Sequence, residues 1–119
     1  MMESRTIDID RAFQALGDPT RRALLERLGP GPISIPMSVS KLAEPFQMTL
    51  AAIVQHLQVL EEAGLVKTEK VGRVRSCRIE AAGLRAAEVW LRARRPEWDR
   101  QLDRLEEFLA DPEQDEQGA

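Results

Sequence analysis

Apolar residues recur at helical spacing in the middle of the chain. Leu50, Ile53, Leu57 and Leu60 lie three or four positions apart, and this spacing predicts a helix with one face against a core. Thr49 precedes the run and has the hydroxyl of a good N-cap, while the glycine at 64 can end a helix in the left-handed conformation. We therefore expect a helix over residues 49–63. Its outward-facing residues would be Ala51, Ala52, Gln55, Gln58, Val59 and Glu62.

Shorter elements flank this helix. A preceding helix, which Ser38 or Ser40 can cap, would end at about residue 45 or 46 and be followed by a turn at 47–48. Alternating β-branched residues within 66–79 predict two short strands that Gly72 joins. Helix, turn, helix and hairpin in this order predict a mainly α fold, the helix-turn-helix with a wing.

The N-terminal part predicts two further helices. Ala12, Phe13 and Leu16 form a short apolar face that Gly17 can end. Asp18 can then cap a second helix, 19–28, that has proline at its first position. We expect this helix to bury Ala23, Leu24 and Leu28 and to expose Arg21, Arg22, Glu26 and Arg27. Solvated or ion-paired roles are favoured for Arg21 and Arg22 over phosphate contact. A glycine- and proline-rich break follows, with a short edge strand expected at 33–36.

The C-terminal part, residues 80–110, is strongly helix-forming. Its apolar stripe is too long for so small a domain to cover, and an exposed stripe favours association. We expect it to pair with its copy across a two-fold axis, although its first half can instead fold back on its own domain. Pro96 predicts a kink, or a break followed by a new helix. The expected dimer-interface residues are Phe13, Leu16, Leu91, Trp98, Leu102, Leu105 and Leu109.

Composition places limits on the function. The 119 residues suffice for one domain, 1–110, and the acidic composition of 111–119 predicts a disordered tail. The net charge is −3, but without the tail 17 basic residues face 16 acidic ones, a net of +1. DNA binding by such a domain must depend on where its charges lie. No apolar run or signal segment predicts membrane insertion, so we expect a soluble, cytoplasmic protein.

Charge is concentrated in the predicted hairpin. Between residues 67 and 78 five basic residues accompany one acidic residue, Glu69, for a net of +4. A solvated basic hairpin and an ordinary surface helix are the alternatives to a nucleic-acid contact here. Because the basic hairpin follows a helix whose outer side is small and uncharged in its first two turns, we favour nucleic-acid contact.

Three segments of the chain resemble the ArsR/SmtB family of bacterial winged-helix repressors. They are the residues from Ala15 to Arg22 with the following Leu24 to Leu28, the residues from Gln55 to Val66, and Gly72-Arg73 with Arg75. The resemblance implies a homodimeric repressor of transcription that binds double-stranded DNA at a pseudo-palindromic operator. With no nucleophile, base and orienting group in sight, we expect no enzymatic activity.

The expected DNA-binding residues are Thr49, Ala51, Ala52, Gln55, His56, Gln58, Lys70, Arg73 and Arg75. Gln55 and Gln58 can pair with adenine edges, and Arg73 and Arg75 can anchor the wing on phosphate. Thr49 and His56 would hold phosphate or base edges, but a helix-packing role for His56 is equally open. The two recognition helices of the dimer would lie about one DNA turn apart, roughly 34–36 Å.

Metal ligands are missing where the resemblance leads one to look for them. Many related sensors carry a thiolate pair flanking one residue, and Ser38-Val39-Ser40 stands at the matching positions. Serine hydroxyls are poor ligands for soft metals, and the C-terminal helix has no histidine, so we expect no metal and no cofactor.

The single cysteine, Cys77, is expected to be a buried, inert thiol, with a redox sensor as the alternative. Two further alternatives concern the whole chain. One is a protein-interaction module that no longer binds DNA, and the other is a regulator that responds to an unidentified small-molecule effector or to redox state.

Overall fold

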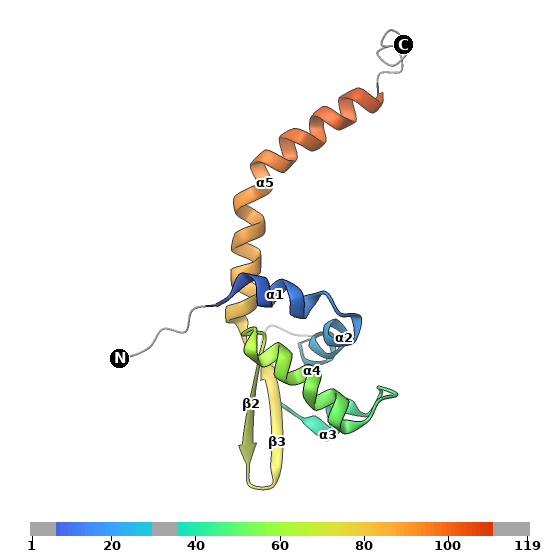
Figure 1. Ribbon diagram of the computed structural model, residues 1–119, viewed down its shortest axis with the longest axis vertical. Coiled ribbons are helices and arrows are strands. Elements are labelled where there is room, and N and C mark those ends of the chain that lie inside the picture. The colour runs from blue at the N-terminus through green and yellow to red at the C-terminus, as the bar shows by residue number, and fades with distance from the viewer. Residues whose placement is uncertain (1–6, 30–35, 111–119) are drawn as a thin grey trace, which may run out of the picture. The chain divides into compact units, whose positions relative to one another are not determined.

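The computed structural model describes residues 7–29 and 36–110 of the chain. The elements within these residues are α1 (Ile9–Leu16), α2 (Pro19–Leu28), β1 (Met37–Ser38), α3 (Val39–Ala43), α4 (Leu50–Glu62), β2 (Val66–Val71), β3 (Val74–Ile79) and α5 (Ala81–Ala110). Helices predominate, and the strands form one antiparallel sheet in the order β1-β3-β2 (Figure 1). The expected winged helix-turn-helix is confirmed, with α3 and α4 as its two helices and β2–β3 as its wing.

Side-chain caps determine where α1, α2, α3 and α4 begin. In α1, Oδ1 of Asp8 accepts from Asp10 N at 3.0 Å. Oδ2 of Asp18 accepts a hydrogen bond from the backbone N–H of Arg21 at 3.0 Å, and Pro19 occupies the first helical position. Ser38 Oγ accepts from Lys41 N at 3.2 Å, and Thr49 Oγ1 accepts from Ala52 N at 3.1 Å. Each cap satisfies an amide that would otherwise lack a partner. The expected caps at Asp18, Ser38 and Thr49 are therefore confirmed.

The wing is a tight hairpin with a two-residue turn. Val71 pairs with Val74, and Gly72, at φ +63°, takes the first turn position with Arg73 after it. Glycine fits here because a side chain would strain that backbone conformation. On the other edge of β3, Met37 pairs with Cys77. The edge strand expected at 33–36 falls mostly outside the described residues, and the described edge strand is Met37–Ser38.

The core lies among α2, α3, α4 and the base of the wing. Leu24, Leu42, Ile53, Leu60 and Cys77 have no exposed surface. Two expectations about this core were wrong. Ala23 is only half-buried. Leu50, expected to face the core, is 50% exposed because it is the first residue of α4, where the helix extends beyond the core.

Helix α5 passes through two compact units, one ending at Ala87 and the other beginning at Glu88. In the first unit, Gly83 packs on the end of α4 and donates its N–H to Gly64 O at 2.8 Å. In the second unit, none of the described residues from Glu88 to Ala110 is buried. The helix begins at Ala81 and continues through Pro96. Of the two alternatives at Pro96, a kink or a break followed by a new helix, the break is therefore excluded.

Candidate nucleic-acid interface

The outer side of α4 carries small and amide side chains. Ala51, Gln55 and Gln58 are exposed, and Ala52 is half-buried. Small residues let a helix approach the edge of a base pair, and amides can both donate to it and accept from it. Thr49 uses its side-chain oxygen to cap the helix.

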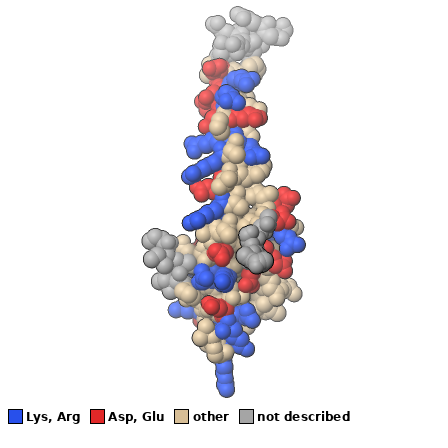
Figure 2. Space-filling view, turned by 90° about the vertical axis from the view of Figure 1, so that its left-hand side faces the viewer, with Lys and Arg blue, Asp and Glu red and all other residues tan. Residues whose placement is uncertain are grey.

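The wing presents basic side chains at its free end. Lys70, Arg73 and Arg75 are exposed, as are the two valines beside the turn, Val71 at 68% and Val74 at 54%. Figure 2 shows Lys and Arg side chains gathered at the lower end of the molecule, where the hairpin lies. Cations at a hairpin end are suited to contact phosphate without reading sequence.

A groove of about 420 Å³ separates the wing from the first turns of α3 and α4. Its described lining consists of Ser38, Val39, Ser40, Leu50, Val54, Arg73, Val74 and Arg75. None of these residues is acidic, so the groove combines apolar and hydroxyl groups with two positive charges. This composition suits an anionic chain with apolar parts.

A hydrogen-bonded chain ties the wing to α4. The carboxylate of Glu61 accepts from the backbone N–H of Thr68 at 3.3 Å and from its hydroxyl at 3.0 Å. Nη1 of Arg75 donates to Oγ1 of the same threonine at 3.2 Å. The base of the wing is thereby held against the end of α4, and Arg75 is oriented along the strand pair.

His56 contacts α2. Its Nδ1 lies 3.3 Å from Nη1 of Arg21. A guanidinium can only donate, so Nδ1 is the acceptor in this contact. Of the two roles left open for His56, this geometry supplies the helix-packing contact.

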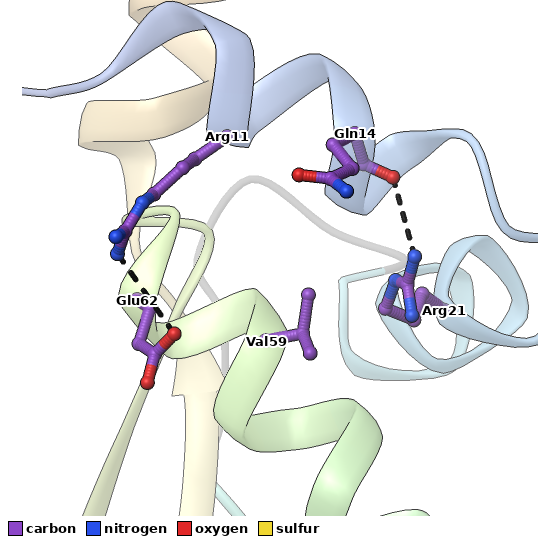
Figure 3. Close-up of a pocket in the computed structure, with 5 residues that line it drawn as sticks. All are labelled: Arg11, Gln14, Arg21, Val59 and Glu62. Carbon is purple, nitrogen blue, oxygen red and sulfur yellow. Dashed lines mark hydrogen bonds and ion pairs between the residues drawn. The ribbon is translucent and has the colours of Figure 1, made fainter.

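Arg21 joins three helices. Its Nε donates to Ala15 O at 2.8 Å and its Nη2 to Gln14 O at 3.2 Å, which satisfies carbonyls at the end of α1. The expectation that Arg21 is exposed was wrong, because these contacts leave it half-buried. Arg21 lies beside Gln14 (Figure 3). Both line a pocket of about 360 Å³, together with Arg11, Val59 and Glu62.

Arg22 and Arg27 also donate to backbone carbonyls. Arg22 donates to Leu16 O at 2.8 Å, and Arg27 donates to Lys41 O at 3.0 Å and Leu42 O at 3.2 Å at the end of α3. Arg27 was expected to be exposed but is half-buried for this reason. Sequence reasoning missed these positioning roles, since the arginines lie far in sequence from some of the carbonyls they bind.

Two titratable groups in this unit have shifted pKa values. The backbone N–H of Arg21 lowers the pKa of Asp18 against the opposing effect of desolvation, with further help from the charge of Arg21. Burial raises the pKa of Cys77 to about 12, and the charge of Glu61 adds to the shift. Cys77 has no exposed surface, so the expected buried thiol is confirmed.

Within the described residues, no group of three or more His, Cys, Asp or Glu side chains is arranged to hold a metal ion. Ser38, which stands where related sensors have a thiolate, uses its oxygen to cap α3. Among the helices in the described ranges, none combines the length and apolar character that a membrane span requires.

Large apolar side chains are exposed along α5. In the unit that begins at Glu88, the exposed ones are Val89, Leu91, Trp98, Leu102, Leu105, Phe108 and Leu109. Trp98 also packs edge-on against Trp90, with ring centroids 5.9 Å apart. In the other unit, Phe13 and Leu16 of α1 are half-buried, and Leu16 packs partly against the core.

Comparison with known proteins supports the winged helix-turn-helix fold. A family profile described as "Helix-turn-helix domain" matches residues 16–69. The chain is 40% identical over 89 residues to the HTH-type transcriptional regulator Rv2034 of Mycobacterium tuberculosis, covering 71% of this chain and 79% of that protein.

Solved structures agree in fold and in family. One is the crystal structure of an ArsR family transcriptional regulator, RHA00566, with 45% identity, a TM-score of 0.68, and coverage of 76% of this chain and 90% of that one. Another is the solution structure of the homodimeric winged helix-turn-helix DNA-binding domain of Mb0332 from Mycobacterium bovis. It is 26% identical, with a TM-score of 0.55 and coverage of 81% and 82%. The chain belongs to the ArsR family of winged helix-turn-helix transcriptional regulators.

Proposed function

We propose that this chain is a homodimeric repressor that occupies a pseudo-palindromic operator and blocks transcription. Each subunit would insert α4 into a major groove and set its wing on the adjoining phosphates or minor groove. The two copies of α4 would lie about one DNA turn apart, roughly 34–36 Å. Such a regulator would act in the cytoplasm, where the bacterial chromosome is.

The observation that carries this proposal is the pairing of two surfaces. The start of α4, through Leu50 and Val54, and the basic end of the wing border one groove, and no described residue lining that groove is acidic. The exposed, uncharged Ala51, Gln55 and Gln58 lie on the same helix. An anionic duplex with base edges in its grooves matches both surfaces. With only +1 net charge outside the acidic tail, binding would be moderate in affinity and steeply dependent on salt.

The proposed role of each side chain in DNA binding follows from its position and exposure. Gln55 and Gln58 read base edges, Ala51 and Ala52 allow close approach, and Thr49 fixes the first turn of α4 at the base pairs. Lys70, Arg73 and Arg75 contact phosphate. His56 acts through its contact with Arg21, which supports α4 on the side that faces α2.

The exposed apolar side chains of α5 support dimerisation. A helix with so many large apolar groups in water is a liability unless a partner covers it, and an identical chain is the partner always at hand. The homodimeric state of the Mycobacterium bovis domain supports the same assembly.

The exposed helix also favours one alternative, a protein-interaction module without DNA binding. A gel shift with DNA from upstream of the gene separates the two functions. A retarded band that survives competition by unrelated DNA supports the repressor, and no retardation at 50 mM salt favours the interaction module.

Substitutions test how the proposed interface works. Replacement of Arg73 and Arg75 by alanine should weaken binding to every DNA sequence and make the salt slope shallower by about 0.9 for each phosphate that is no longer bound. Gln55→Ala should instead change which sequences are preferred. Arg85→Ala, an exposed cation at the start of α5, is the matched control and should leave the slope unchanged. An unchanged slope in the double wing variant contradicts the phosphate role, and a uniform loss with Gln55→Ala contradicts base reading.

A further inference from the structure

Leu50 is a large apolar residue that the core does not cover. It follows the cap Thr49 as the first residue of α4, and half of its surface is exposed. Its side chain lines the groove between the wing and the first turns of α3 and α4. A leucine there lacks the burial that its spacing with Ile53 and Leu57 would otherwise give it.

The surroundings of Leu50 show what kind of molecule would cover it. Val54, one turn further along α4, lies in the same groove, and the wing contributes Val74 on the opposite side. Arg73 and Arg75 add positive charge, and Ser38 and Ser40 add hydroxyls. The occupant must therefore be anionic on one side and apolar on another. A DNA strand has this character, since its phosphates are charged and each thymine carries a methyl group in the major groove.

Resting on the proposed function, we infer that Leu50 is a specificity-determining residue that packs on a thymine methyl group, with Val54 behind it. The N-terminal residues of a recognition helix are the ones that reach base edges. At such an edge the methyl of thymine is the apolar feature that the other bases lack. Leu50 thus selects thymine at one position in each half-site, next to the bases that the glutamines read.

The test removes only the methyl group. An operator is first selected from genomic fragments, and each thymine is then replaced singly by uracil, which pairs identically but lacks the methyl. Binding constants are measured by fluorescence anisotropy at fixed salt for the wild type, for Leu50→Ala and for Val59→Ala. Val59 is an exposed apolar residue of the same helix that lines a different pocket, which makes it the matched control.

We expect one thymine in each half-site whose replacement weakens the wild type about three- to fivefold, the amount that burying one methyl group predicts. Leu50→Ala should lose this sensitivity, and Val59→Ala should keep it. Because Leu50 is exposed, its truncation should leave folding intact, which thermal unfolding of the variant checks.

Three results would overturn the inference. If uracil weakens wild type and Leu50→Ala equally at every position, or if no thymine is sensitive in the wild type, Leu50 does not read a methyl group and sequence-specific DNA binding still stands. If no DNA sequence is preferred over any other, the proposed function fails together with this inference.

Discussion

Single side chains on α2 hold the neighbouring helices in place. Arg21 binds two carbonyls of α1 and the ring of His56 on α4, and none of these contacts involves a carboxylate. Its N–H groups are therefore used to satisfy acceptors inside the protein. This use separates Arg21 from the exposed arginines of the wing.

Replacement of Arg21 by alanine should lower the free energy of unfolding by about 1–3 kcal/mol, because it removes the side-chain donor to the part-buried Ala15 O and to the His56 ring, and one of two donors to Gln14 O. Arg22→Ala, which removes an exposed hydrogen bond to one carbonyl, should cost less. Urea unfolding at a fixed protein concentration measures both variants. Equal midpoints for the two variants would contradict the role of Arg21.

Cys77 makes stability depend on pH in the alkaline range. Its pKa in the folded protein is about 12, above the ordinary 9.0, so the unfolded chain releases this proton first. The free energy of unfolding should therefore fall as pH rises from 9 toward 12, and Cys77→Ser should lessen this fall. Thermal unfolding at a series of pH values checks the sign.

The same burial predicts a protected thiol. An alkylating reagent at pH 8 should modify Cys77 only after urea unfolds the protein. Rapid modification of the native protein would instead favour the redox-sensor alternative.

At the scale of elements, the junction of α4 and α5 depends on Gly83. A Cβ at this position would overlap the carbonyl oxygen of Ala63 and lie 2.9 Å from that of Gly64. In most helices a glycine-to-alanine change stabilises by up to about 1 kcal/mol, so the sign of its effect here is diagnostic.

Gly83→Ala should therefore destabilise the protein, by about 1–3 kcal/mol, because the added methyl group forces α5 away from the end of α4. Ala82→Gly, next to it on an exposed position, is the control and should cost about 1 kcal/mol through helix propensity alone. Denaturant unfolding measures both. A stabilised Gly83→Ala variant would contradict the close packing.

Many features of the individual helices were predictable from the sequence. Caps are local, so Asp18, Ser38 and Thr49 could be recognised before the fold was known. The exposure of Leu50 could not be predicted. Periodicity shows which face of a helix is apolar, but it does not show where along the helix the core ends. The carbonyl contacts of Arg27 were equally hidden, since they join residues 14 and 15 positions apart. Helix α5 continues through Pro96, although proline has a low propensity for the interior of a helix.

At the scale of the whole molecule, the exposed stripe on α5 predicts the oligomeric state. Most helical stability in proteins comes from packing of an apolar face, and from Glu88 to Ala110 no described side chain is buried within one chain. A second copy would supply that packing.

Replacement of both Leu102 and Leu105 by glutamate should shift the protein from dimer to monomer, because it places charges on the proposed interface. Sedimentation equilibrium should give twice the chain mass for the wild type and for Glu106→Gln, an exposed control on the same helix. A double variant that stays dimeric at micromolar concentration would contradict this interface.

The most direct test of a dimer that reads two half-sites is a hydroxyl-radical footprint on the selected operator. We predict protection of two segments on one face of the duplex, with centres one helical turn or a multiple apart, roughly 10–10.5 base pairs per turn. A single protected segment, or none at concentrations where the protein is dimeric, would contradict it.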